Sequence, residues 1–365
     1  MRQTTLSNGK TVSALGIGGH YKHFEYGRYE ETYGPVEESE VTSRTRLVEQ
    51  AVDNGVTYFD STWYNEAEML GKTLARAGVR NKVHVNGMVL GAFPGSVAFG
   101  MSEREYFSKY LDKRLAVMPG NYFDSFMINA IEEHYNRDKC AELVDLLLRR
   151  KQSGDIGMIG FSCHNHPLAR EIADEFPEFE IIMTAYNFRN HWFEKSFEGY
   201  NGNASFVAMK PMVWAQYGIP FNTINRIADF EQKFGFVPVD DIAVKALRYP
   251  GMHPRLNVTL ASVNTEDELK QFLAAGRGEN TPDDLEILAK YDNVINMDKG
   301  APLFIGGLEL GNTRTAFFCA DNLCNLLGID KTGLTVKNDN REQVLEEFKK
   351  KIYSELKNSP LNKYL

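Results

Sequence analysis

Short apolar segments rich in β-branched and aromatic residues alternate with longer amphipathic segments along most of this chain. Residues 43–55 show the helical pattern, because Leu47, Val48 and Ala51 share one face and Gly55 follows the last apolar position. The apolar segments are short and bounded by turn residues, which indicates strands. Eight strands are predicted, at residues 14–18, 56–62, 82–89, 121–130, 155–163, 180–187, 205–212 and 257–263.

The alternation of strands and helices predicts a parallel sheet covered by helices. Eight such units within about 250 residues favour a closed (β/α)8 TIM barrel over an open sheet. No Gly-x-Gly-x-x-Gly motif follows a predicted strand, which argues against a Rossmann domain. Two short β-like runs flank Asn8-Gly9, a strong turn signal, and predict an N-terminal hairpin at the base of the barrel.

The repeating pattern stops near residue 280, at the polar segment "GRGENTPDD". We therefore predict a barrel domain over residues 1–280 and a C-terminal extension over residues 281–365. The extension contains helix-like runs at 285–294 and 341–357, so we expect it to be mainly helical and to pack on the barrel.

The composition is that of a globular protein, with 43% hydrophobic and 25% charged residues among 365. A net charge of −8 argues against a general nucleic-acid partner. No apolar run approaches the roughly 18 residues of a membrane span, and the N-terminus lacks a signal peptide, so we expect no membrane association and a cytoplasmic location. The scattered cysteines are expected to be buried thiols: Cys140, Cys163, Cys319 and Cys324.

In barrels of this class the active site lies on the loops that follow the strands. Polar residues at strand ends often only cap the next helix, and this interpretation stays open for each isolated Asn, Ser or His. Asp60 and Tyr64 stand out, because an acid that ends a strand is followed at a fixed spacing by an aromatic hydroxyl. The polar residues at the predicted strand ends are His20, His23, Asp60, Tyr64, Asn86, Asn129, Ser162, His164, Asn187, Lys210 and Asn264.

Several segments, in this order, resemble the aldo/keto reductase superfamily over roughly residues 3 to 275. They include "LSNGKTVSALGIGG", "AVDNGVTYFDSTWYNEAEMLGKTLA", "SGDIGMIGFSCHN", "AMKPM" and "ASVNTEDELKQF". "IGFSCHN" and "AMKP" are most similar to a branch of predicted bacterial oxidoreductases that often carry a C-terminal iron–sulfur extension. The resemblance implies a nicotinamide-dependent reduction of a small carbonyl substrate.

Members of this family use an Asp, Tyr, Lys and His tetrad, in which tyrosine donates a proton to the carbonyl oxygen. The lysine stabilises the phenolate of a side chain whose ordinary pKa is about 10. The resemblance places the aspartate at Asp60 and the tyrosine at Tyr64, but the lysine position is Met88 and the histidine position is Asn129. Tyr64 is therefore expected to be a weak acid, and His164 is a candidate to replace part of the lost chemistry.

The resemblance also implies where a cofactor would bind. The Ser-Asn pair that holds the nicotinamide carboxamide matches Ser162 and Cys163, and the family's glutamine matches Met183. The position of a basic residue near the adenosine 2′-phosphate matches Glu268, so NAD is expected rather than NADP. Lys210, at the end of the seventh strand, would add positive charge. A barrel that binds no cofactor stays open as an alternative.

Metal sites are not predicted. An iron–sulfur cluster needs four thiolates, whereas "CADNLC" offers two and no third cysteine lies near. No HExxH or similar spacing of ligands occurs.

Three functional interpretations fit these residues. The favoured one is a divergent nicotinamide-dependent oxidoreductase that acts on a small carbonyl or alcohol. The second is a catalytically inactive barrel that binds a small molecule or a protein partner, and the third is a lyase or isomerase on the same scaffold. A homo-oligomer, or a protein partner bound through the C-terminal extension, is compatible with all three.

Overall fold

The computed structural model describes residues 1–19, 36–89, 100–131, 135–212, 225–226, 229–297, 304–305 and 308–309. All eight predicted strands form within these residues, and they close into one parallel barrel. The order around the barrel is β10-β3-β4-β5-β6-β7-β8-β9. The strands are β3 (Leu15–Gly18), β4 (Tyr58–Ser61), β5 (His84–Val89), β6 (Phe123–Ile128), β7 (Ile156–Cys163), β8 (Ile181–Ala185), β9 (Ser205–Met209) and β10 (Leu256–Ser262). The predicted (β/α)8 barrel is confirmed.

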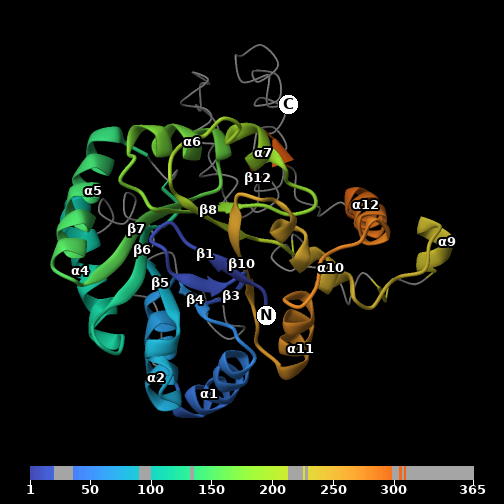
Figure 1. Ribbon diagram of the computed structural model, residues 1–365, viewed down its shortest axis with the longest axis horizontal. Helices are drawn as coiled ribbons and strands as arrows, with labels where there is room; N and C mark the ends of the chain where they lie inside the picture. Colours follow the sequence, from blue (N-terminus) through green and yellow to red (C-terminus); the bar gives the residue numbers. More distant parts are fainter. Residues whose placement is uncertain are drawn as a thin grey trace.

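The N-terminal hairpin closes one end of this barrel, as predicted. Its strands β1 (Gln3–Thr5) and β2 (Thr11–Ser13) pair antiparallel around a turn in which Gly9 has a φ of 82°, a conformation that glycine adopts without strain. In the same turn the Ser7 hydroxyl donates to the carbonyl of Glu180, 3.0 Å away and just before β8 begins. Figure 1 shows the hairpin lying across the middle of the barrel.

Helices surround the strands (Figure 1). α2 illustrates why they end where they do, because Gly78 follows its last residue with a φ of 63° and accommodates the left-handed cap. The helices around the barrel are α1 (Glu38–Asp53), α2 (Tyr64–Ala77), α4 (Glu103–Val117), α5 (Arg137–Gln152), α6 (His166–Glu175), α7 (Trp192–Ser196), α10 (Ile242–Arg248) and α11 (Glu266–Ala275), with 3-10 turns at Arg80–Lys82 and Pro250–Met252 and a short α9 (Phe230–Phe234).

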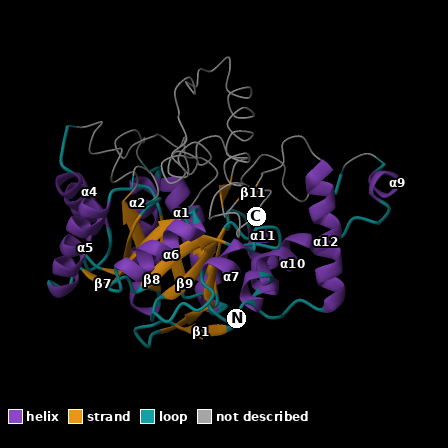
Figure 2. Cartoon of the chain, turned by 90° about the horizontal axis from the view of Figure 1, so that it is seen from above, coloured by secondary structure: helices purple, strands orange, loops and turns teal. Residues whose placement is uncertain are grey.

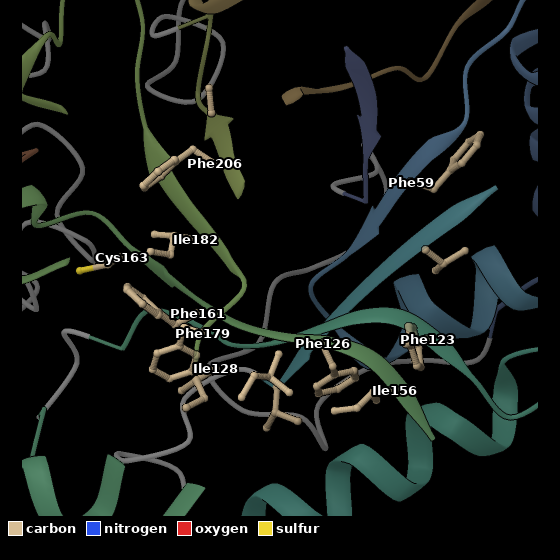
Figure 3. Close-up of a cluster of buried hydrophobic side chains, with 14 of the residues drawn as sticks. Phe59, Phe123, Phe126, Ile128, Ile156, Phe161, Cys163, Phe179, Ile182 and Phe206 are labelled. Atoms are coloured by element: carbon tan, nitrogen blue, oxygen red, sulfur yellow. The ribbon is translucent and has the colours of Figure 1, made fainter. Parts of the chain in front are cut away.

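Successive strand residues alternate between two separate cores. The outer core fills the space between strands and helices, and Figure 3 shows part of it, including Phe161 and Phe179, whose ring centroids lie 4.8 Å apart. The inner core fills the barrel itself and is rich in flexible thioethers. Its buried side chains are Leu6, Val12, Tyr58, Met88, Met127, Met158, Ile181, Met183, Val207, Val258 and Leu260.

The described part of the C-terminal extension begins with α12 (Pro282–Met297), which includes the helix predicted at 285–294. Leu288 and Tyr291 of α12 are buried against Ile242 and Ala246 of α10, and Figures 1 and 2 show the two helices side by side. A short antiparallel pair, β11 (Phe304–Ile305) with β12 (Leu308–Glu309), follows. The predicted terminal helix lies outside the described residues, and the domain boundary at 280 stays a prediction.

Two further expectations concern the chain as a whole. Cys140 and Cys163 are buried free thiols, as predicted, whereas Cys319 and Cys324 lie outside the described residues. In the part of the chain that the structure describes, no helix combines the length and apolar character needed to cross a membrane.

Candidate functional site

The predicted site residues lie mainly at one end of the barrel, which we call the barrel mouth: the carboxyl ends of the strands at Gly18, Ser61, Val89, Ile128, Cys163, Ala185, Met209 and Ser262. Parallel pairing of all eight strands brings these ends together. The strands hold Asp60, Met88, Ser162, Cys163 and Met183; Asn129, His164 and Lys210 directly follow strands; Tyr64 opens α2 and Glu268 lies in the first turn of α11. His20 and His23 lie outside the described residues.

Asp60 is held by a side chain of the neighbouring strand. Its carboxylate is 5% exposed, and the Asn86 side-chain amide donates to its Oδ1 atom at 2.6 Å. Asn86 faces Asp60 in the strand register, two residues before Met88 on β5. The amide of Asn86 on β5 therefore binds Asp60, and the predicted match of Met88 to the family's lysine places a thioether two residues further along the same strand.

Met88 and Asn129 contact each other. Met88 is buried, and the Asn129 side-chain nitrogen donates to its sulfur at 2.8 Å. The same nitrogen lies 3.4 Å from the Ser162 hydroxyl, which accepts a bond from the Ala130 amide at 2.8 Å. A thioether carries no charge and an amide does not titrate. The Asn129 amide can therefore donate a hydrogen bond, but neither it nor the Met88 thioether can exchange a proton near neutral pH.

Two residues at the barrel mouth have an unfavourable backbone conformation. Ala130 and Lys210 have φ values of 45° and 58°, in the left-handed region that residues other than glycine rarely adopt. Lys210 directly follows β9 and Ala130 lies two residues after the end of β6. The Lys210 carbonyl accepts a bond from the Asn187 side chain at 3.0 Å. Such a conformation costs about 1 kcal/mol or more and is concentrated at functional sites.

The loop that leads into Tyr64 is fixed from two sides. The Glu66 carboxylate accepts bonds from the backbone amides of Thr62 and Trp63, at 2.8 and 3.0 Å. The Arg114 guanidinium, brought in by α4, donates to the Thr62 carbonyl at 2.8 Å. Both charged side chains are fully buried. The position of Tyr64 is thus set by two buried charges, and the role of Arg114 was not predicted from the sequence.

Tyr64 is protonated near neutral pH. Partial burial and the Glu68 carboxylate raise the pKa of its hydroxyl, and the weaker effects of Arg114 and Lys72 oppose this change. The direction of this pKa change is opposite to the one that a close lysine would cause. Burial, followed by the charge of Asp60, raises the pKa of another tyrosine, Tyr58 in the inner core.

Glu268 occupies the N-terminus of α11. Its carboxylate accepts bonds from the backbone amides of Asn264 and Thr265, at 2.6 and 3.3 Å, and the Thr265 hydroxyl accepts from the Glu268 amide at 3.1 Å. This capping box places a negative charge where helix N-termini commonly bind phosphate.

Two of the residues matched to the family's cofactor contacts are buried in the cores. Cys163 is fully buried in the outer core, beside Phe161 in Figure 3, and its thiol donates to the Asn165 carbonyl at 3.2 Å. Because neighbouring strand residues point to opposite faces, Cys163 turns away from the barrel interior that Ser162 faces. Met183 is 3% exposed and packs within the inner core. Neither side chain is available as a hydrogen-bonding contact at the mouth.

His164 follows β7 and is half-buried. Among the residues that the structure describes, no group of three His, Cys, Asp or Glu side chains is arranged to hold a metal ion.

Two residues below the mouth were not predicted. The Ser125 hydroxyl donates to the side-chain oxygen Oδ1 of Asn86 at 2.7 Å, and His84 Nε2 lies 2.9 Å from the same hydroxyl. Side chains alternate between the two faces of a strand, so "HVNGMV" places His84, Asn86 and Met88 on one face of β5. This alternation could have identified His84 from the sequence.

Comparison with known proteins agrees with this architecture. Residues 26–199 match the model of the aldo/keto reductase family, and no curated protein sequence matches the chain. The barrel is similar to the crystal structure of an aldo/keto reductase from Klebsiella pneumoniae in complex with NADP and acetate. The TM-score is 0.57 and the sequence identity is 15%. The match covers 80% of this chain and 95% of the Klebsiella chain. At this identity the structural match shows the fold alone. Over residues 26–199 the chain is therefore similar to the aldo/keto reductase family, and its closed barrel is consistent with a divergent member of that family.

Proposed function

We propose that this chain is a nicotinamide-dependent oxidoreductase that acts on a small carbonyl or alcohol substrate and reduces ordinary aldehydes slowly. The observation that carries the proposal is the buried carboxylate of Asp60, held by Asn86 at the barrel mouth. A buried carboxylate is costly unless it is hydrogen-bonded, so its presence at the end of β4, four residues before Tyr64, favours a working site.

The residues at the mouth fit NAD better than NADP. The Ser162 hydroxyl accepts from Ala130 and keeps its own proton to donate to a carboxamide oxygen. The Glu268 carboxylate suits a ribose hydroxyl and would repel a 2′-phosphate. The Klebsiella protein binds NADP, so this chain would differ from it in cofactor preference.

A bound reduced nicotinamide would supply hydride. Tyr64 is the proton donor that the resemblance to the family implies, and Asn129 would orient the carbonyl oxygen through its amide. Because burial and Glu68 raise the Tyr64 pKa, proton donation would be slow near neutral pH. Slow turnover of generic aldehydes follows from this property.

The test is a fluorescence titration with NADH and NADPH, followed by steady-state assays with nitrobenzaldehyde. We expect NADH to bind more tightly and the aldehyde to be reduced slowly. Binding of neither nucleotide would overturn the proposal, and so would reduction at rates typical of the family.

A second candidate is a catalytically inactive barrel that binds a small molecule. The contact between Asn129 and Met88 favours it, because the two side chains that replace the family's lysine and histidine satisfy each other. Tight binding of a nucleotide or metabolite with no turnover of any carbonyl or alcohol would support this alternative.

A further inference from the structure

A chain of buried hydrogen bonds runs through the barrel interior to Asp60. From the base it passes from His84 to Ser125, from Ser125 to Asn86, and from Asn86 to Asp60, with distances of 2.9, 2.7 and 2.6 Å. His84, Asn86 and Ser125 are fully buried. The ring of His84 stacks on Tyr58 with a centroid distance of 4.8 Å and an interplanar angle of 12°.

These bonds have a direction. The Asn86 nitrogen donates to Asp60, so the Asn86 oxygen is left to face Ser125, and the Ser125 hydroxyl must donate to it. The hydroxyl has one proton, so the Ser125 oxygen can only accept from His84, which requires a proton on Nε2. His84 Nδ1 is buried and has no hydrogen-bond partner among the described residues. An unpaired acceptor there costs less than an unpaired N–H would, which agrees with the same tautomer.

The hydrogen bonds would run in the opposite direction if Asp60 were protonated. If Asp60 carried a proton and donated it to Asn86, the amide would turn, Ser125 would donate to His84 Nε2, and the His84 proton would sit on Nδ1. The tautomer of His84 therefore reports whether Asp60 acts as an acceptor at the mouth.

We propose that Asn86, Ser125 and His84 are positioning residues that hold Asp60 as a hydrogen-bond acceptor at the barrel mouth. Asn86 contacts the carboxylate from β5, the strand whose Met88 occupies the lysine position. Ser125 and His84 fix the orientation of the Asn86 amide. The assignment of Asp60 to an active site rests on the proposed function, whereas the direction of the hydrogen bonds does not.

The first test is the tautomer of His84, measured by long-range ¹⁵N–¹H NMR of the histidine rings near neutral pH. The chain has eight histidines, and the His84→Gln variant identifies the signal by its loss. We expect a single neutral ring protonated on Nε2. A ring protonated on Nδ1 would overturn the proposal, because Ser125 would then donate to His84 and not to Asn86.

The second test removes the central hydroxyl. Ser125→Ala should abolish the single Nε2 pattern, and Ser125→Thr should restore it because it keeps a hydroxyl. Thr184→Val is the matched control, since Thr184 is a fully buried strand hydroxyl outside this chain of bonds. An unchanged tautomer in Ser125→Ala would overturn the proposed role of Ser125.

Kinetics separate this proposal from the proposed function. We expect Ser125→Ala to lower turnover about tenfold, with less than about a twofold change in the Kd of NADH, as for loss of one positioned hydrogen bond. Equal losses in turnover for Ser125→Ala and Thr184→Val would contradict a positioning role. If the natural protein bound no nucleotide, the proposed function would fail, and the NMR result would still decide the direction of the bonds.

Discussion

The side-chain nitrogen of Asn129 lies 2.8 Å from the sulfur of Met88, so the two residues that we match to the histidine and lysine of the family tetrad contact each other. The pair is complementary in its present form, since an amide N–H faces a weak acceptor. A change at only one of the two positions therefore leaves the other without its partner.

This contact leads to the first prediction. The double variant Met88→Lys with Asn129→His should gain measurable aldehyde reduction over the natural protein, because a lysine stabilises the phenolate of Tyr64 and a histidine can titrate. We expect a gain of about tenfold or more in kcat/KM with nitrobenzaldehyde, a loss of about 1.4 kcal/mol from the barrier. Adding Tyr64→Phe should abolish it.

Met88→Lys alone is the informative comparison. It places a charge in a site that is 1% exposed, so we expect a lower urea midpoint than for the double variant. A double variant that folds and binds NADH without any gain would show that the mouth does not serve hydride transfer to a carbonyl.

Glu268 provides the second prediction. Glu268→Gln keeps an oxygen that can accept from Asn264 and Thr265 but removes the negative charge. We expect it to tighten NADPH binding about tenfold and to leave NADH binding nearly unchanged. Glu266→Gln, which changes charge in the same helical turn outside the capping box, is the control. Equal effects of the two variants on NADPH would reject a specific role for Glu268.

The third prediction concerns pH and His84. Burial lowers its pKa to about 3; the Asp124 carboxylate opposes this change, and Lys10 and Arg80 add to it. Between about pH 6.5 and 3 the unfolded chain therefore binds a proton at His84 that the folded protein does not. Stability contributed by this neutral ring is present above pH 6.5 and is lost as pH falls, by about 1.4 kcal/mol per pH unit.

The measurement compares urea unfolding of the natural protein and His84→Gln from pH 6.5 to 4.5. Glutamine retains an N–H donor for Ser125 but does not titrate. The natural protein should lose stability more steeply than the variant as pH falls. Parallel losses would show that His84 is protonated in the folded protein.

The fourth prediction tests the docking of α12 on the barrel. The Lys245 ammonium donates to Asp241 at 2.7 Å and to Asp284 at 2.6 Å, and so joins α10 to the start of α12. Lys245→Ala should lower the free energy of unfolding by about 1 to 2 kcal/mol, because two carboxylates lose their common partner. Lys270→Ala removes an exposed ion pair with Asp267 and should leave the urea midpoint unchanged. Equal midpoints for both variants would contradict a stabilising role for this junction.

The pattern of apolar and polar residues along the chain was sufficient to predict the barrel architecture. Apolar runs such as residues 155–163 are too short for helices and are bounded by Gly and polar residues, so they predict strands, and amphipathic segments between them predict covering helices. The Asn8-Gly9 turn predicts the hairpin in the same local manner. The match of Met88 and Asn129 to the lysine and histidine positions of the family tetrad stays a prediction, because it depends only on the resemblance along the chain.

The partners of these residues were decided by the tertiary structure. Arg114 reaches Thr62 across 52 positions, and Ser125 reaches Asn86 across 39. Such contacts depend on strand register and on which face each side chain takes, and a shift of one residue would exchange the inner and outer cores. The position of Cys163 in the outer core depends in the same way on which face of β7 is turned toward the helices. The hydrogen bond from Asn86 to Asp60 exists because parallel pairing sets these two residues side by side on adjacent strands.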